Sequence, residues 1–416
     1  MAASVAVTAS LLGLRFTGAL QPFELYFYDG FLRSRPDEGP DDRLVIIEIN
    51  DQDIAQRSSE ERMGPLSISD KTLAELLEKL KSYNPKVIGL DIQRPFETKL
   101  ESLKKRYQTA PNLIAICADP NPEDVDPGHR NTEGASAPLN IPGSLIDQRV
   151  GFSNFIYNED RGIIRRHLLQ REPPAGSPCF ARFSFSLRVA SSYLNQPIQI
   201  VQTPTEEVYS LAGVNFSPLQ SHTGGYQGID DRGHQILLNY RTHLKSPINS
   251  FTRVTLTNFL SGQNVPFTAD EFKKKPRIVL IGITAASRGD IFETPYSGGK
   301  KDTQGVIIHA QMISQILSAV ESQRSLLWTW PQPIEWLWIG FWSLAGGMLA
   351  LWLRSPLHLI LATGIVLVIL TWLCYTFLRN GGWIPFFPPV LAILATEVVV
   401  ISYTTFQSWQ TLRRAE

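Results

Sequence analysis

RLVIIEIN, residues 43–50, is a run of branched apolar residues typical of a strand that is buried on both faces of a sheet. A helix is predicted to follow Ser69, which is a favourable N-cap residue. Its apolar positions recur at helical spacing, at Leu73, Leu76, Leu77 and Leu80. Asn84-Pro85 ends this helix, and KVIGLDI, residues 86–92, forms a second strand. This order predicts a βαβ unit with parallel strands and a right-handed crossover.

The segments that follow alternate in the same way. Helices are predicted at Glu97–Tyr107, Ala181–Leu194 and Gly305–Val320. Further strands are predicted at Asn112–Cys117, Val150–Phe155, Ile163–Leu169, Gln235–Asn239 and Arg277–Ile283. The stretch Asp119–Pro142 is rich in Pro, Asn, Asp and Gly, which predicts a long loop. The predicted fold class is an α/β domain with a mostly parallel or mixed sheet, followed by an all-α region.

Three long apolar runs follow this domain, with only short polar linkers between them. They are Ile334–Leu353, Leu357–Leu378 and Ile384–Thr404. A helix of about 20 residues spans the hydrocarbon core of a bilayer, whereas a soluble helix of that length shows a polar face. The runs therefore predict three transmembrane helices and a short tail, residues 405–416; the alternative is a buried three-helix core. Pro331 and Pro333 predict a helix break at Trp330–Gln332, with the first run starting anew at Ile334.

The N-terminal segment Ala2–Leu20 is also apolar, but it is short and contains Arg15. Three interpretations stay open: a membrane anchor, a cleaved signal peptide or an ordinary helix. A signal peptide has a basic region before its apolar run, and no basic residue precedes Ala2. A start codon upstream of Met1 would supply that charge. We take residues 1–20 as an anchor and residues 21–331 as one intervening domain.

Charges in the short connections predict the orientation of these spans. With four spans, both termini lie on the same side of the membrane. Arg354 in the first linker and the Arg413-Arg414 pair in the tail favour the cytoplasm for that side, and Arg379 in the second linker weakly opposes this. Domain 21–331 is therefore predicted to lie outside the cytoplasm.

Composition and cysteine content limit the partners and the compartment. The chain has 39 basic and 39 acidic residues, so it lacks the positive surplus that attracts nucleic acid. Membrane lipid is the predicted contact instead. Of the three cysteines, Cys374 falls in an apolar run, whereas Cys117 and Cys179 lie in the predicted external domain. Those two could form one disulfide in an oxidising compartment; the alternative is two unrelated buried thiols.

Acidic residues follow several predicted strands. Asp51 and Asp91 come after the first two, and Asp290 follows the last. Ligands of open parallel sheets bind beyond the carboxyl ends of the strands, so these acids could bind a ligand or act as acid and base. The alternative is that they cap helices and turns. We predict no catalytic residue, no metal site and no cofactor, because the sequence has no GxSxG, P-loop or HExxH motif and no Cys/His cluster at zinc spacing.

Three further charged residues are candidates for special roles. Arg165 and Arg166 are adjacent on a predicted strand, so their side chains point to opposite faces. One of them should then need a buried carboxylate partner, for which Asp91 or Asp160 is expected. Glu397 lies inside the last apolar run, where an ionisable group is costly and marks a candidate functional site. The alternative is that Glu397 reaches a polar partner within the bundle.

A family resemblance is carried by short motifs in a fixed order along nearly the whole chain. They include LQPFEL (20–25), VIIEIND (45–51), VIGLD (87–91), GFSN (151–154), GIIRR (162–166), FSFSL (183–187) and LNYR (238–241). Together with three membrane runs after the domain, they resemble the second family of CHASE domains, the cyclase- and histidine-kinase-associated sensory extracellular domains.

This resemblance implies a periplasmic sensor of the bacterial inner membrane that binds a small-molecule or protein ligand. Members of the family usually feed a kinase or nucleotide cyclase. Here no output domain follows the last apolar run, so the expected partner is a separate cytoplasmic output protein, and a homodimer is compatible with this arrangement. The protein is not expected to be an enzyme. A membrane-tethered hydrolase that uses the acidic strand ends is the alternative, and a transporter with Glu397 in its path is a third option.

Overall fold

The computed structural model describes residues 1–56, 68–120, 133–156, 162–203 and 207–415. The chain forms two compact units. We call the first the helical unit; it comprises Met1–Arg35, Leu219–Asp231 and Leu327–Glu416. The second, the sheet unit, comprises Pro36–Pro218 and Arg232–Leu326. This division differs from one continuous domain over 21–331, because residues 21–35 and 219–231 pack with the helices.

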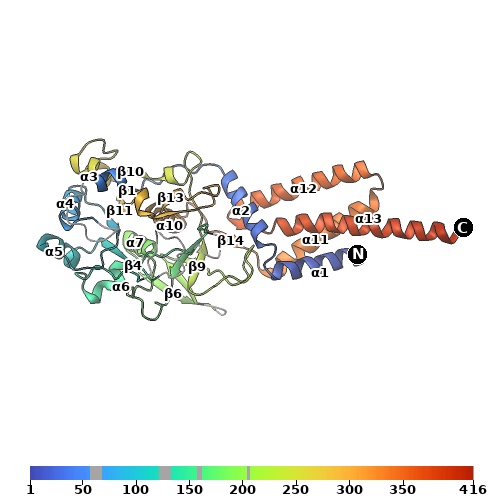
Figure 1. The fold of residues 1–416 in the computed structure, drawn as a ribbon, viewed down its shortest axis with the longest axis horizontal. Coiled ribbons are helices and arrows are strands. Elements are labelled where there is room, and N and C mark those ends of the chain that lie inside the picture. The colour runs from blue at the N-terminus through green and yellow to red at the C-terminus, as the bar shows by residue number, and fades with distance from the viewer. Residues whose placement is uncertain (57–67, 121–132, 157–161, 204–206, 416) are drawn as a thin grey trace. The chain divides into compact units, whose positions relative to one another are not determined.

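A six-stranded sheet forms the centre of the sheet unit (Figure 1), and all of its strand pairs are parallel. Its order is β10 (Thr252–Thr255), β1 (Leu44–Ile49), β11 (Ile278–Ile283), β2 (Val87–Asp91), β3 (Leu113–Cys117) and β4 (Val150–Phe152). The predicted α/β fold is therefore confirmed. The strands of the first βαβ unit are parallel as expected, but β11 lies between them.

Helices cover both faces of this sheet (Figure 1), because its strands are apolar on both sides. One face packs against α4 (Asp70–Leu80), α5 (Glu101–Thr109), α8 (Leu256–Ser261) and α9 (Ala269–Lys274). The other packs against α7 (Phe185–Leu194) and α10 (Gly305–Val320). Alternate residues of one strand serve the two cores; in β1, Ile47 belongs to the first and Ile46 to the second.

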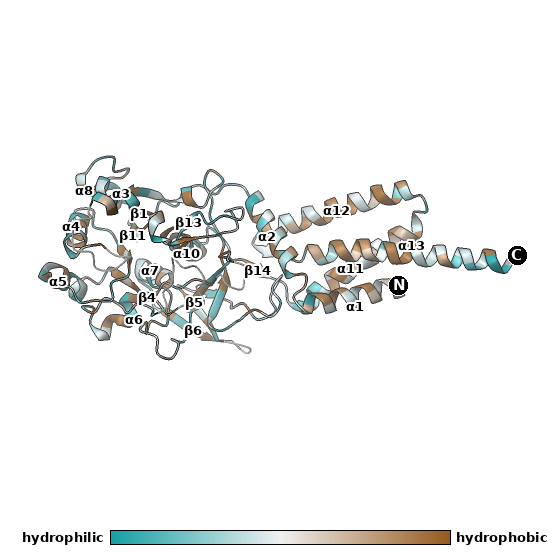
Figure 2. Ribbon diagram, viewed as in Figure 1, coloured by the Kyte–Doolittle hydropathy of each residue, from teal (hydrophilic) through white to brown (hydrophobic). Residues whose placement is uncertain are grey.

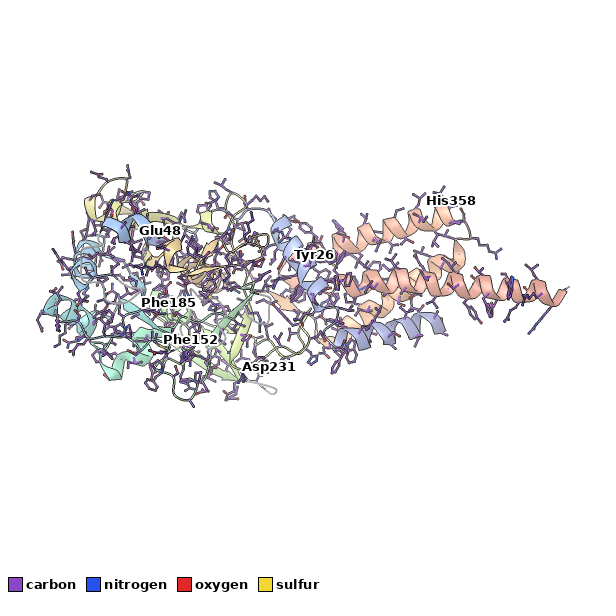
Figure 3. The ribbon with its side chains drawn as sticks, in the orientation of Figure 1. Tyr26, Glu48, Phe152, Phe185, Asp231 and His358 are labelled. Carbon is purple, nitrogen blue, oxygen red and sulfur yellow. A yellow bond between two sulfur atoms is a disulfide. The ribbon has the colours of Figure 1, made fainter. Side chains whose placement is uncertain are left out.

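Glycines in the strands let two helices approach the sheet closely. A Cβ on Gly151 would lie 2.4 Å from the backbone of Phe185 in α7, and one on Gly282 would lie 2.5 Å from Val306 in α10. Larger residues at either position would push the helix away. Phe152 and Phe185, labelled in Figure 3, pack into the two different cores.

Smaller elements complete the sheet unit. They are α3 (Asp51–Gln56), α6 (Ile146–Arg149), the antiparallel pair β5 (Arg166–Gln170) and β9 (His234–Leu237), the three-stranded sheet β6 (Ile198–Gln202), β7 (Glu207–Leu211) and β8 (Val214–Phe216), and the pair β12 (Ile291–Phe292) and β13 (Thr303–Gln304). Most predicted strands and helices are present with shifted ends. The helix predicted from Ala181 begins at Phe185, because the side chain of Ser184 accepts a hydrogen bond from the Leu187 N–H and caps it.

Three helices of the helical unit are long and apolar enough to cross a membrane. They are α11 (Gln332–Trp352), α12 (Pro356–Arg379) and α13 (Phe387–Ala415). Figure 2, a ribbon coloured by hydropathy, shows that their residues are mostly hydrophobic and that the carboxyl end of α13 is more polar. A break precedes the first span as predicted, with Pro331 as the N-cap residue of α11 and Pro333 in its first turn, but the helix begins at Gln332, two residues before the predicted start at Ile334.

The third span differs from its predicted bounds at both ends. It was expected at Ile384–Thr404, but α13 begins at Phe387 and continues to Ala415, through the residues expected to form a short tail. Gly382 and Trp383 instead form β15, which pairs with β14 (Trp328–Thr329). Pro385 contributes to the late start of the helix, because a proline disfavours helical geometry in the residue before it, which here is Ile384.

The N-terminal segment forms two helices rather than one. They are α1 (Ala2–Phe16) and α2 (Gln21–Ser34), with a bend of 86° between them, and they count as a fourth span only if the bent pair is taken together. Helix α1 packs against α11 and α13 within the helical unit. The choice between an anchor and a cleaved signal peptide stays a prediction.

Small residues bring α1, α11 and α13 together. A Cβ on Gly346 would lie 2.7 Å from the carbonyl oxygen of Ile393. Next to it, the Ser343 hydroxyl lies 2.7 Å from the Thr396 hydroxyl and donates to the Ser4 carbonyl at 3.1 Å. Close backbone approach and hydroxyl contacts of this kind are typical of helix association in membranes.

Candidate functional site

Two acids and two histidines of the sheet unit come together near the carboxyl ends of its strands. We call Asp91, Asp290, His309 and His167 the acid–histidine cluster. Asp91 ends β2, and Asp290 immediately precedes β12. His309 lies in the second turn of α10, and His167 lies in β5.

The close approach of α10 to the sheet builds this cluster. The Nε2 atom of His309 lies 4.0 Å from Oδ1 of Asp91, and both side chains are buried, with 3% and 9% of their surface exposed. The carboxylate of Asp290 lies beside Gly305, where a Cβ would come within 2.7 Å of Oδ2. Glycine at 305 is therefore required for Asp290 to reach the start of α10.

Burial and mutual repulsion set the protonation of the two acids. Burial, together with the charge of Asp290, raises the pKa of Asp91 well above its usual value. Burial also raises the pKa of Asp290 to about 6, against an opposing hydrogen bond from the Gly305 backbone. Because the two carboxyls interact, they titrate as a coupled pair, and ionisation of one raises the pKa of the other.

The two histidines are held neutral. Burial lowers the pKa of His309 and of His167 to about 3 each, and for His167 the nearby His309 adds to the effect. The Nε2 atom of His167 lies 3.1 Å from the Ser186 hydroxyl. The Nδ1 atom of His167 has no hydrogen-bond partner among the residues that the structure describes, whereas the Ser153 backbone interacts with His309 and partly opposes the lowering of its pKa.

This arrangement can take up and release protons, or orient a polar ligand, at the edge of the sheet. Asp290 is half-buried. Within the described ranges, no group of three or more His, Cys, Asp or Glu side chains is placed to hold a metal ion.

Asp51 does not join the other two acids. Its carboxylate is exposed and accepts hydrogen bonds from the backbone N–H groups of Ala286 at 2.8 Å and Ser287 at 3.2 Å. These bonds, with the hydroxyl of Ser287 contributing most, lower the pKa of Asp51. The expectation that three acids meet at one edge is thus wrong for Asp51, which has the capping role given as the alternative.

Arg165 and Arg166 are both buried, which differs from the expectation that only one of them faces inward; Arg165 precedes β5, so the two residues do not both alternate on a strand. Arg166 donates a hydrogen bond of 2.8 Å to the side-chain oxygen of Gln235. Asp91 is not the expected carboxylate partner, since its ionic neighbours are His309 and Asp290. Asp160, the other expected partner, lies outside the described residues.

The predicted disulfide between Cys117 and Cys179 is present. It joins the end of β3 to a segment 62 residues later in the chain. Cys374 is free and buried in α12. A disulfide in the sheet unit agrees with an oxidising compartment.

Glu397 lies within the helical bundle. Its Oε1 atom accepts a hydrogen bond of 2.7 Å from the Thr363 hydroxyl of α12, and 7% of the residue is exposed. This is the contact given as the alternative to a functional role. A role for Glu397 beyond this contact stays a prediction.

A second polar site, in the helical unit, involves the loop Leu219–Asp231. Arg15 of α1 forms an ion pair with Glu335 of α11 and donates a hydrogen bond of 2.6 Å to the Gly224 carbonyl. The side-chain amide of Gln332 donates to the carbonyl of His222 at 3.1 Å. The loop is therefore bonded to both helices.

Helix α2 completes this second site. The backbone N–H of Gln227 donates to the side-chain oxygen of Gln21 at 2.8 Å. Glu24 accepts hydrogen bonds from the N–H groups of Phe386 at 2.9 Å and Phe387 at 2.8 Å. A carboxylate at this place stabilises the positive end of the α13 dipole. We call Arg15, Gln21, Glu335 and Gln332, with the loop 219–231, the loop clamp.

Sequence reasoning missed His167 and the loop clamp. His309 lies within the helix predicted at Gly305–Val320, and no sequence motif distinguishes it from a packing residue. A pattern of turn residues gives no information on where loop 219–231 docks. Arg15 and Glu335 do carry a signal, because two opposite charges in neighbouring apolar segments are costly unless they pair.

Comparison with known proteins agrees with these features. The family model of the CHASE2 domain matches residues 5–348. No curated protein and no solved structure matches the chain. The parallel sheet unit and three apolar helices at its carboxyl end fit the sensory architecture expected from the motifs. The chain therefore belongs to the CHASE2 family, whose domains are sensory extracellular domains of signal transduction.

Proposed function

We propose that the protein is a sensor of the bacterial inner membrane whose sheet unit lies in the periplasm. It binds an external small-molecule or protein ligand and passes the signal through its membrane helices to a separate output protein in the cytoplasm. The disulfide supports the periplasmic placement. The basic residues Arg354, Arg413 and Arg414 support a cytoplasmic position for that end of the helices.

The contacts of the loop clamp are the main support for this proposal. Loop 219–231 belongs to the helical unit, yet the chain enters it from β8 and leaves it into β9, which both belong to the sheet unit. A shift of either strand is therefore passed through the chain to groups that are bonded to α1, α2 and α11. A differential binding energy of about 1–3 kcal/mol is enough to shift such an equilibrium.

The placement is tested by cysteine labelling in cells. A Glu101→Cys variant, exposed on α5, should react with an impermeant thiol reagent once the outer membrane is permeabilised. A Ser408→Cys variant near the end of α13 should react only after lysis. The reverse pattern would invert the orientation.

Signal transfer is tested by removing two tethers of the loop. A Gln21→Ala, Gln332→Ala double variant loses the hydrogen bonds to Gln227 and His222 without adding bulk. Cells that carry it should show the transcript changes of a deletion strain, at an unchanged protein level. Gln323→Ala is the matched control and should behave as the parent, because the side chain of Gln323 is exposed and donates a hydrogen bond to Glu321 of the sheet unit. A parental profile in the double variant would contradict transfer through the loop.

The same strains separate a sensor from a membrane-tethered hydrolase. An Asp91→Asn, Asp290→Asn double variant removes both ionisable carboxyls of the cluster. A sensor shows an altered response without turnover in either form. Hydrolysis by the parent that disappears in this variant would favour the enzyme.

A further inference from the structure

A cleft of about 650 Å³ opens at the amino ends of β3 and β4, at the opposite end of the strands from Asp91. Its walls come from the ends of α5 and α6, from α7 and from the segment that leads into β6. This volume lies within the range of small-molecule binding sites. No local sequence motif marks this end of the sheet.

Arg188 is the first of two arginines that line this cleft. Its guanidinium carbon lies 4.5 Å from the centre of the Phe183 ring, which supports one face of the group. Among the described residues, no acceptor forms a hydrogen bond with its side chain. Arg188 also lies in the first turn of α7, where the helix dipole disfavours a positive charge. Its charge is therefore poorly compensated by the protein.

Arg149 is the second arginine, and only 3% of it is exposed. Its Nε donates to the Leu113 carbonyl at 3.1 Å and its Nη1 donates to the Tyr107 carbonyl at 2.5 Å. These acceptors orient the guanidinium but carry no formal charge. Its Nη2 has no hydrogen-bond partner in the part of the chain that the structure describes.

Asp147 is the acidic residue of the cleft, and it does not pair with either arginine. It is exposed, and in the described ranges no ion pair joins it to Arg149 or Arg188. Burial lowers the pKa of Arg188 to about 10, and Asp147 only partly offsets this. Burial alone lowers the pKa of Arg149. Burial therefore makes both guanidinium charges energetically costly, and an anion bound in the cleft would offset that cost.

We propose that this cleft binds a small organic acid, with Arg188 as the residue that contacts its carboxylate and the buried charge of Arg149 adding to the attraction. A guanidinium presents a planar set of donors that matches a carboxylate, and the stacked ring of Phe183 holds that plane in place. Ser191 and Asn195 offer polar groups for the rest of the ligand. The biological meaning of this site, as the sensor's ligand site, rests on the proposed function, but the binding itself does not.

The test is calorimetric titration of the full chain in detergent with acetate, succinate, citrate and inorganic phosphate at constant ionic strength. At least one of the organic acids should bind with saturation. Arg188→Gln should weaken that binding about tenfold or more, since a charge-assisted hydrogen bond is lost. The affinity of Arg188→Lys should lie between those of the parent and of Arg188→Gln, because lysine keeps the charge but not the planar donors.

Arg182→Gln is the matched control, since Arg182 is an exposed arginine that pairs with Glu172 and does not line the cleft. It should bind as the parent does. Saturable binding of phosphate alone would overturn the assignment to an organic acid. Binding of none of the four anions, or binding that Arg188→Gln leaves unchanged, would overturn the site.

This test is independent of signal transfer. If the organic acid binds through Arg188 but the loop-tether variant still signals normally, the site stands and the proposed transfer route fails. If the loop-tether variant loses its response while no anion binds, the transfer route stands and this site fails.

Discussion

Each of the two units of this protein contains a cluster of buried ionisable groups, and the two clusters differ in how their charges are compensated. In the helical unit, Arg15 is paired with Glu335, and Glu24 accepts two backbone hydrogen bonds. In the sheet unit, Asp91 and Asp290 face each other and neutral histidines. The first arrangement fixes charges in place, because each has a partner. The second leaves charge uncompensated, so its protonation can respond to the surroundings.

The largest expected effect is the loss of a fixed pair. Replacing Arg15 by alanine leaves Glu335 buried without its partner, which should lower the free energy of unfolding by about 3–5 kcal/mol. Thermal unfolding of the full chain in detergent measures this. The double variant Arg15→Met, Glu335→Leu removes both charges and should regain most of the stability. A double variant as unstable as the single one would show that the pair is not the cause.

The next effect concerns a covalent constraint that only the sheet unit has. Replacing Cys117 and Cys179 by serine removes a cross-link that spans 62 residues and should cost about 2–4 kcal/mol. Reducing the parent should have the same effect on the unfolding midpoint, and reducing the variant should have none. Mass spectrometry of unreduced peptides checks the pairing. Freely alkylated cysteines without reductant would contradict both the bond and the oxidising compartment.

The acid–histidine cluster should give a smaller effect of opposite sign. The pKa of Asp290 is about 6 in the folded chain and near 4 when unfolded, so its ionisation opposes folding. This penalty is absent below about pH 4 and complete above about pH 6. Asp290→Asn should therefore raise the free energy of unfolding at pH 7 by about 1–3 kcal/mol.

The histidines act in the other direction as the pH falls. His167 and His309 have pKa values of about 3 in the folded chain, so they oppose folding once the unfolded chain takes up protons below about pH 6.5. The parent combines both trends. Asp290→Asn should lose stability more steeply on acidification than the parent does, as measured by thermal unfolding between pH 4 and pH 7. Superimposable pH profiles would contradict the cluster.

The smallest effect tests uncharged contacts in the helical unit. Ser343→Ala removes the hydroxyl that contacts Thr396 and the Ser4 carbonyl. Hydrogen bonds between membrane helices contribute about 0.6 kcal/mol on average, so stability should change by about that amount. Gly346→Ala, on the same helix face, should cost more because its Cβ would meet the backbone of Ile393. The opposite ranking would show that hydroxyl contacts outweigh close packing here.

The sequence predicted the parallel sheet, because buried strands have an apolar pattern that can be recognised locally. It placed Asp51 and Asp91 at strand ends correctly but could not order the strands. Since β11 lies between β1 and β2, these two acids start about 10 Å apart. Asp290 follows β11 and thus meets Asp91. Pairing order depends on contacts far apart in sequence, which a local pattern does not contain.

The cleft and the loop clamp could not be predicted from the sequence, for a related reason. Arg149 and Arg188 are separated by 38 intervening residues, and nothing in the spacing of two arginines marks a shared cleft. Loop 219–231 lacks any periodicity that would place it. The disulfide was predictable because only two cysteines lay outside the apolar runs, which left one pairing within the chain.

The path of the chain between the two units has a practical consequence for dissecting the protein. Because Leu219–Asp231 belongs to the helical unit, the sheet unit is not one contiguous stretch of the gene. A fragment cut at residues 36 and 326 would carry that loop along, with Tyr226 separated from Trp383, the ring it packs against. A soluble, crystallisable sheet unit therefore calls for a short glycine-containing turn in place of residues 219–231 as well as removal of both ends.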